Sequence, residues 1–291
     1  MEVLPQSLVF VGGGYIAFEF AHLAARAGAQ ATILHKGAHP LAGFDPEVVE
    51  QLLAVTREVG ITVHLGTTVT RIERDGSGAV VVHAQQGGTQ KQFRAEAGVL
   101  AAGRVPAIGD LELDDGDVEY TKHGVTVNSF LQSVSNPNVY AAGDAADGGG
   151  LALTPVAGYE GEIVASNLLH GNHRTTNFSG LSSMVYTIPP LGSTGLTEAE
   201  ARKQGIDCKV RTGDMTQWYS ARHVAARRAF YKVVFEKTTR KLLGATILGP
   251  HAEEQINIVA LAIRNGLDAE ALAKTLFAYP TAASDFEYIV G

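Results

Sequence analysis

The stretch "SLVFVGGGYIAFEFAHLAARAG", residues 7–28, constrains the fold more than any other part of the chain. Its apolar start, residues 8–11, predicts a short buried strand that runs into three glycines. From Tyr15 the apolar residues recur at helical spacing until Gly28, which predicts a helix. A strand, a glycine turn and a helix in this order are typical of a βαβ unit, so the sequence predicts an α/β fold.

The glycines themselves fit the pattern G-x-G-x-x-A through Gly12, Gly14 and Ala17. We expect Gly12 to make the sharp turn, Gly14 to let a pyrophosphate approach the backbone, and Ala17 to allow close packing of helix on strand. The helix N-terminus, with Tyr15 and Ile16 in its first turn, then supplies free N–H groups and a positive dipole end. The alternative is a glycine turn without a ligand, which the strand–turn–helix context disfavours.

The end of the second predicted strand, "ATILHK" at residues 31–36, bears on the choice of cofactor. NAD sites place an Asp or Glu there to bind the ribose hydroxyls, whereas this chain has His35 and Lys36 and no acid until Asp45. A lysine ammonium attracts the 2′-phosphate that a carboxylate would repel. We therefore expect NADP rather than NAD, and the alternative is that Lys36 is an ordinary surface charge.

The rest of the first hundred residues completes the βαβ unit. A helix is predicted over residues 45–60, with Asp45 as its N-cap and Pro46 at its first position. Short alternating strands follow at "ITVHLG", "VTRIERD" and "AVVVHAQ", which indicates a small antiparallel insert. Another helix is predicted over residues 154–171, after "YAAGDAAD", and a polar cluster at 175–179 marks a boundary.

Beyond that boundary strands are followed by helices, which is typical of an α+β domain. Thr197 and Glu200 form a predicted capping box, and "RAFYKVVFEKTTRKLLGATILG" predicts a hairpin around "KTTRK". Two amphipathic helices follow, at "HAEEQINIVALAIRNG" and "DAEALAKTLF". The first carries an apolar stripe at Ile256, Val259, Ala260 and Ile263.

Composition excludes several classes of partner and site. The net charge is −7 without a block of like charge, which argues against nucleic acid and anionic membrane surfaces, and no apolar run is long enough to span a membrane. Cys208 is the only cysteine, so an internal disulfide is impossible. Because "MEVLPQSLVF" lacks the features of a signal peptide, we expect a cytoplasmic protein. His170 and His173 form the closest histidine pair, but no cysteine or clustered carboxylate accompanies them, so we expect no metal site.

Six segments occur in an order that resembles one family: "VFVGGGYIAFEFA", "LAAGRVP", "NVYAAGDAAD", "LTPVA", "YTIPPLGSTGLTEAEA" and "YPTAASD". Together they resemble the flavoprotein pyridine nucleotide-disulfide oxidoreductases of the glutathione reductase, dihydrolipoamide dehydrogenase and mercuric reductase type. The resemblance implies a Rossmann-type NAD(P)-binding domain at 1–106, the C-terminal half of an FAD-binding domain at 107–177, and an α+β dimerisation domain at 178–291. It also implies a homodimer that forms through residues 178–291.

The resemblance further assigns roles to individual residues. Asp144, beside Gly143, would bind the ribityl and pyrophosphate region of FAD, and Thr154 would present its backbone near the flavin ring. Tyr15 matches the aromatic residue that covers the nicotinamide pocket. Glu19 matches an acid that pairs with a lysine beside the flavin. Gly103 and Arg104, in "AAGRVP", match a segment near the nicotinamide cofactor. Without the resemblance, Tyr15 and Glu19 would be interpreted as helix surface or core packing.

Two features depart from the family pattern. The family's first FAD glycine fingerprint and its C-x4-C redox pair are absent, and on the family layout about 150 residues would precede Met1. The family's C-terminal His and Glu are replaced by Tyr279 and Ser284, and a tyrosine is a poor general acid–base near neutral pH. Tyr279 is therefore only a weak candidate for a catalytic residue, and glutathione reduction is not expected.

The family reaction is hydride transfer from NAD(P)H to FAD and on to a disulfide or another acceptor. We expect the chain to bind NADP or NAD but not to hold FAD stoichiometrically, because the FAD pyrophosphate needs a glycine turn of its own. The alternative function is that of a non-catalytic fragment that binds a nucleotide and dimerises.

Overall fold

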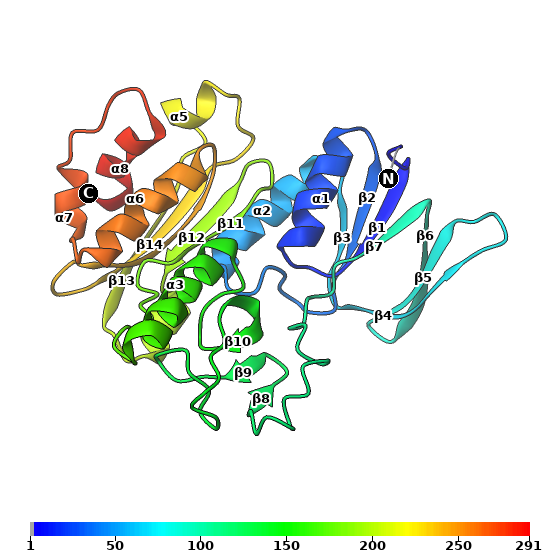
Figure 1. Cartoon of the computed structure of the whole chain (residues 1–291). Helices are drawn as coiled ribbons and strands as arrows, with labels where there is room; N and C mark the ends of the chain where they lie inside the picture. Colours follow the sequence, from blue (N-terminus) through cyan, green and yellow to red (C-terminus); the bar gives the residue numbers. More distant parts are fainter. Residues whose placement is uncertain (1–2) are drawn as a thin grey trace. The chain divides into compact units, whose positions relative to one another are not determined.

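The computed structural model describes residues 3–291 (Figure 1). The described chain divides into two compact units. The first unit comprises residues 3–102 together with 179–291, and the second comprises residues 103–178. The expected limits of the three domains stay a prediction.

Four parallel strands form the first sheet, in the spatial order β3-β2-β1-β7. The strands are β1 (Ser7–Val11), β2 (Gln30–Leu34), β3 (Thr62–His64) and β7 (Ala97–Leu100). Leu8 and Phe10 of β1 face a core that they share with two helices, α1 (Tyr15–Arg26) and α2 (Pro46–Glu58). Val9 and Val11 point to the opposite face, into a second cluster. The strand–turn–helix prediction for residues 7–28 is thus confirmed.

An antiparallel insert provides the second cluster. It consists of β4 (Thr67–Arg74), β5 (Val80–Gln86) and β6 (Thr89–Ala95). Val80 and Val82 of β5 pack against Val9 and Val11 of the parallel sheet. The sequence predicted two of these strands but missed β6, because "TQKQFRA" is too polar to show a clear apolar alternation.

Five antiparallel strands form the second large sheet of the first unit, in the order β11-β12-β15-β14-β13. The strands are β11 (Ser182–Val185), β12 (Leu191–Gly195), β13 (Cys208–Asp214), β14 (Phe230–Glu236) and β15 (Leu242–Leu248). The helices of this part are α4 (Glu198–Lys203), α5 (Tyr219–Arg222), α6 (Ala252–Arg264), α7 (Ala269–Ala273) and α8 (Phe286–Val290), with the short 3-10 helix η2 (Ala282–Asp285) before α8. The β14–β15 hairpin and the capping box of Thr197 and Glu200 are confirmed.

Helix α6 packs on the strands β12 and β15 through the apolar stripe found in the sequence. Ile256 and Val259 are fully buried in a cluster with Tyr231, Val233 and Phe235. These side chains therefore form the core of the unit itself, and a dimer contact would have to use other residues.

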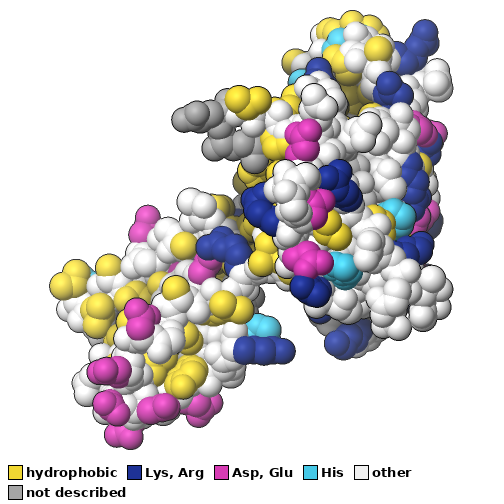
Figure 2. Space-filling view, turned by 90° about the vertical axis from the view of Figure 1, so that its right-hand side faces the viewer, with side chains coloured by type: hydrophobic (Ala, Val, Ile, Leu, Met, Phe, Trp, Pro, Cys, Tyr) yellow, Lys and Arg dark blue, Asp and Glu magenta, His cyan; other side chains and the backbone are white. Residues whose placement is uncertain are grey.

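The second unit contains a small sheet in the order β10-β9-β8 and one long helix, α3 (Thr154–His170). The strands are β8 (Tyr120–Thr121), β9 (Gly124–Thr126) and β10 (Ala146–Asp147), and the short 3-10 helix η1 (Gly143–Ala145) precedes β10. Within the described residues, no helix is long and apolar enough to cross a membrane. On the face shown in Figure 2, Lys and Arg side chains are interspersed with acidic and uncharged ones.

Candidate functional site

The turn between β1 and α1 requires glycine at Gly12. Its φ is 132°, a value that favours glycine, and a side chain there would overlap the carbonyl oxygen of Ala101. The Gly12 amide donates to the Leu34 carbonyl oxygen at 2.9 Å, and the Ala101 amide donates to that of Val11 at 2.8 Å. The turn is therefore tied to the ends of two neighbouring strands.

Gly14, by contrast, faces open space at the N-terminus of α1. A Cβ atom on Gly14 would meet no atom within 4 Å, and no side chain caps the helix. Among the described residues, the first helix amide with an intrachain acceptor is that of Phe18, which donates to the Gly14 carbonyl oxygen at 3.3 Å. The amides of Tyr15, Ile16 and Ala17 are thus available to an anion. The Ala17 side chain is fully buried against the sheet, as its place in the motif predicts.

The segment after β2, residues 35–45, offers no free carboxylate to a ligand at this turn. The His35 ring packs against Gly13, and its Nε2 atom lies 3.1 Å from the carbonyl oxygen of His39. Lys36 is exposed. Asp45, the next acid in the sequence, is only 3% exposed, because it caps α2 and pairs with Lys232. Asp45 is therefore not free to bind ribose hydroxyls.

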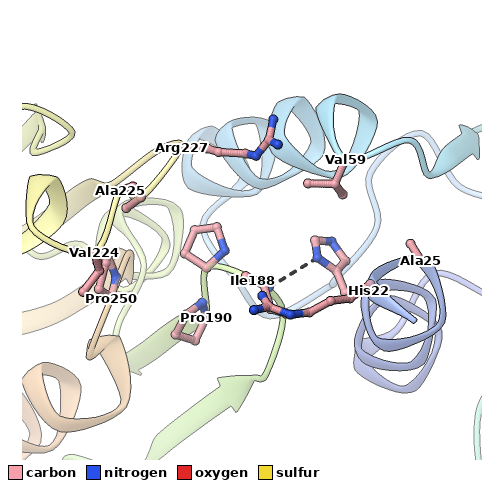
Figure 3. Close-up of a pocket in the computed structure, with 12 residues that line it drawn as sticks. His22, Ala25, Val59, Ile188, Pro190, Val224, Ala225, Arg227 and Pro250 are labelled. Carbon is pink, nitrogen blue, oxygen red and sulfur yellow. Dashed lines mark hydrogen bonds between the residues drawn. The ribbon is translucent and has the colours of Figure 1, made fainter. Parts of the chain in front are cut away.

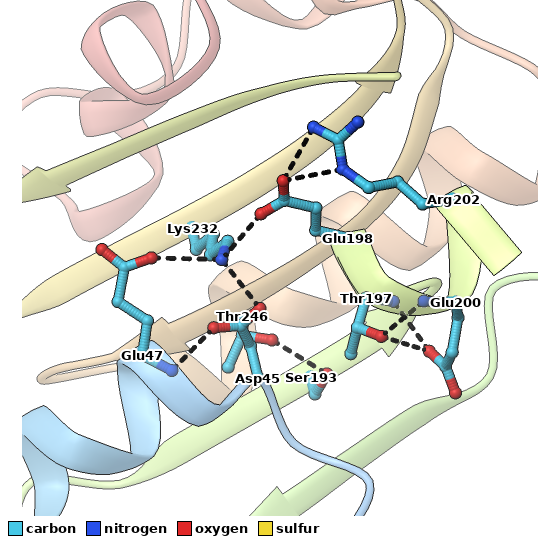
Figure 4. A network of polar contacts seen from close by, with 9 residues as sticks. All are labelled: Asp45, Glu47, Ser193, Thr197, Glu198, Glu200, Arg202, Lys232 and Thr246. Atoms are coloured by element: carbon cyan, nitrogen blue, oxygen red, sulfur yellow. Dashed lines mark hydrogen bonds and ion pairs between the residues drawn. The ribbon is translucent and has the colours of Figure 1, made fainter. Parts of the chain in front are cut away.

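A buried lysine joins strand β14 to the first turns of the helices α2 and α4 (Figure 4). The Nζ atom of Lys232, on β14, lies 3.1 Å from carboxylate oxygens of Asp45, Glu47 and Glu198. Burial alone would lower the pKa of Lys232, but hydrogen bonds to Asp45, Glu198 and Glu47 outweigh burial and raise it. The ammonium group therefore stays charged. Sequence reasoning missed this network, and its only signal was a lysine inside the apolar run "FYKVVF".

Helix α1 also contacts the segment that follows β11. A Glu19 carboxylate oxygen accepts a hydrogen bond from the Tyr186 amide at 2.8 Å, and His22 Nδ1 accepts one from the Ile188 amide at 3.3 Å. His22 Nε2 lies 3.0 Å from the Thr56 hydroxyl, which donates to the backbone of its own helix. Burial lowers the pKa of His22 to about 4, so the imidazole is neutral. In this structure Glu19 thus positions a backbone segment.

The predicted flavin residues lie together in the second unit. Asp144 forms an ion pair with Arg104 at 3.1 Å, and both side chains are exposed. Gly143, with φ of 64°, donates its amide to the buried carboxylate of Glu160 at 2.6 Å. Burial raises the pKa of Glu160 even though the Gly143 hydrogen bond lowers it. Glu160 therefore fixes the turn that carries Asp144, and sequence reasoning did not identify it.

Two further predicted residues of this unit lie at a helix start and at a backbone position that favours glycine. Thr154 is the first residue of α3, whose N-terminus has no side-chain cap. Gly103 has φ of 122°, which favours glycine.

His170 and His173, the histidine pair, have ring centroids 6.0 Å apart, and the His173 nitrogens contact Ser166 and Gly171. Among residues 3–291, no group of three or more His, Cys, Asp or Glu side chains is arranged to hold a metal ion.

The candidate acid–base position near the C-terminus is built from aromatic side chains. Tyr279 is 78% exposed, and its ring centroid lies 6.1 Å from that of Tyr219, which stacks on His223. The Ser284 hydroxyl donates to the Thr281 carbonyl oxygen at 2.6 Å. Ser284 therefore stabilises its own turn.

Comparison with known proteins places this arrangement in a family. Residues 1–161 match the model of the pyridine nucleotide-disulphide oxidoreductases. The chain belongs to this family. Residues 181–289 match the model of the same family's dimerisation domain. The predicted fold class, an α/β Rossmann-type NAD(P) domain with a partial FAD domain and a following α+β dimerisation domain, is confirmed.

Individual relatives cover between 62% and all of this chain. The mercuric reductase of Streptomyces lividans is 33% identical over 97% of this chain, which spans 59% of that protein. The HOCl-induced flavoprotein disulfide reductase RclA of Escherichia coli has a TM-score of 0.88 and 28% identity, and this chain spans 65% of it. An uncharacterized 19.7 kDa protein of a Staphylococcus aureus mercuric resistance operon is 43% identical over its full length, which corresponds to 62% of this chain. This member of the family thus spans less than two thirds of its mercuric reductase and RclA relatives.

Proposed function

We propose that this chain binds NADP(H) at the turn between β1 and α1 and forms the nucleotide-binding, dimerising part of a flavin-dependent oxidoreductase. The observation that carries this proposal is the uncapped N-terminus of α1, where Gly14 faces open space and three amides lack acceptors. A pyrophosphate would accept hydrogen bonds from these amides and benefit from the helix dipole.

The preference for NADP(H) rests on charge at the end of β2. Lys36 is exposed, whereas Asp45 is buried in the Lys232 network. A 2′-phosphate would therefore meet a cation, and the ribose hydroxyls of NAD(H) would lack the usual carboxylate acceptor. The exposed ring of Tyr15 borders the same helix N-terminus and can cover a bound nicotinamide.

The nicotinamide nucleotide supplies hydride when it is bound, and flavin is the family's first acceptor. In the second unit, Asp144 and the N-terminus of α3 at Thr154 are the groups suited to flavin, and Glu160 keeps the Gly143 turn in place. A second candidate function is nucleotide binding and dimerisation without catalysis, and the flavin absorbance of the purified chain distinguishes the two. We also propose a cytoplasmic location.

The test of the proposal is calorimetric titration of NADPH and NADH into the chain and its variant Lys36→Glu. We expect NADPH to bind more tightly than NADH, and Lys36→Glu to weaken NADPH binding about tenfold while leaving NADH binding nearly unchanged. The control is Lys209→Glu, which makes the same charge change at an exposed residue of β13. Equal affinity for both nucleotides, or equal effects of both variants, would contradict the preference.

A further inference from the structure

The first unit contains a cavity of about 460 Å³ at the opposite end of α1 from the glycine turn (Figure 3). The cavity lining begins on α1 at His22, which lies about 10 Å along the helix axis from Tyr15. Its walls come from the last turns of α1 and α2 and from three loops of the second sheet. The lining residues are His22, Ala25, Arg26, Val59, Ile188, Pro189, Pro190, Val224, Ala225, Ala226, Arg227 and Pro250.

Most of this wall cannot recognise a polar ligand. Its prolines, Pro189, Pro190 and Pro250, have no amide hydrogen to donate. His22 lines the cavity, but both of its ring nitrogens already have partners within the chain. Ala25 and Val59 contribute only apolar atoms. The body of any ligand in this cavity must therefore be apolar.

Two arginines provide the charged groups of the cavity. No ion pair or hydrogen bond joins the side chain of Arg26 or Arg227 to another of the described residues. Among residues 3–291, no Asp or Glu lines the cavity. The acid near the end of α2, Glu58, is already paired with Arg228 at 3.1 Å. Figure 3 shows Arg227 reaching along α2 toward Val59. The cavity thus combines apolar walls with unbalanced positive charge.

We infer that this cavity binds a compact amphipathic carboxylate. The apolar body would lie among Ala25, Val59 and Pro190, and the carboxylate would accept hydrogen bonds from the guanidinium groups of Arg26 and Arg227. The volume is in the range that small-molecule sites occupy. The cavity and the predicted nucleotide turn lie at opposite ends of α1. The carboxylate site is therefore distinct from the nucleotide site.

The first test uses benzoate as the probe and follows backbone amide chemical shifts of the full chain. We expect saturable shifts at the amides of Ala25, Val59 and Ala226. Benzamide has the same ring without the charge and should bind about tenfold more weakly, and acetate has the charge without the ring and should give no saturable shift. Benzamide binding as tightly as benzoate, or no saturable shift with benzoate, would overturn the inference.

The second test assigns the charge to the two arginines. Arg26→Gln and Arg227→Gln should each weaken benzoate binding several-fold, and the double variant should abolish it. Both residues are exposed, so the variants should keep the unfolding temperature of the parent. Arg57→Gln, on the exposed face of α2 and outside the cavity lining, is the matched control and should bind benzoate like the parent. A double variant that still binds benzoate like the parent would overturn the inference.

Discussion

At the scale of single residues, Gly14 and His22 have different roles at the two ends of helix α1. Gly14 leaves the N-terminus of the helix open, whereas His22, two turns later, fastens the helix to the chain after β11 through the Ile188 amide. The sequence identified Gly14 through its motif. It could not identify His22, because a single histidine on a helix gives no sign of which distant amide it will meet.

His22 should make stability depend on pH. Burial lowers its pKa from 6.5 to about 4, so between these values the unfolded chain binds a proton that the folded chain does not. The free energy of unfolding should therefore fall as the pH drops from about 6.5 toward 4, by up to about 3 kcal/mol from this group. Urea unfolding of the parent and of His22→Asn at several pH values isolates the effect. If both proteins lose stability equally over this range, His22 is not the cause.

At the scale of elements, patterns that depend on neighbouring residues were predictable and patterns that depend on distant ones were not. The sequence predicted α1, α2, the capping box of α4 and the β14–β15 hairpin, since each has its signal within a few residues. Strand β12 was missed because "LGSTG" has one apolar side chain, and β13 because the alternation in "CKVRTGD" is limited to Cys208 and Val210. The Lys232 network was not predicted, because the three carboxylate partners of this lysine lie far away in the sequence.

The Lys232 network should contribute strongly to stability. Lys232→Met leaves the buried carboxylate of Asp45 without its cation, and we expect a loss of about 3 kcal/mol in the free energy of unfolding. The control is Lys237→Met, which removes an ion pair with Asp207 whose side chains are 63% and 72% exposed. That change should cost no more than about 0.5 kcal/mol. Urea denaturation measures both, and similar small losses would show that the buried network is not stabilising.

At the scale of the whole molecule, the match of residues 181–289 to a dimerisation domain supports association of two chains. The apolar stripe of α6 was consistent with either a core face or a contact face, and the structure buries Ile256 and Val259 in the core. Apolar side chains remain exposed elsewhere in the domain, among them Leu261 at 62% and Leu276 at 99%. Periodicity alone cannot separate a core face from an interface face, since both are apolar.

We expect the chain to be a homodimer in solution. Sedimentation equilibrium at micromolar concentration should give twice the chain mass of 30.7 kDa. Val259→Glu, within the stripe that packs in the core, should lower stability, whereas Leu276→Glu should leave stability unchanged because that side chain is exposed. A single species of 30.7 kDa would contradict association through this domain alone.

The measurement that tests the central claim most directly is the affinity of NADPH for Gly14→Val compared with the parent chain. A Cβ atom at this position meets no protein atom within 4 Å, so the added side chain points into the open space that we propose for the pyrophosphate. We predict that NADPH affinity falls at least about tenfold while the free energy of unfolding changes by no more than about 1 kcal/mol. Unchanged NADPH affinity in Gly14→Val, or no saturable binding to the parent, would contradict nucleotide binding at this turn.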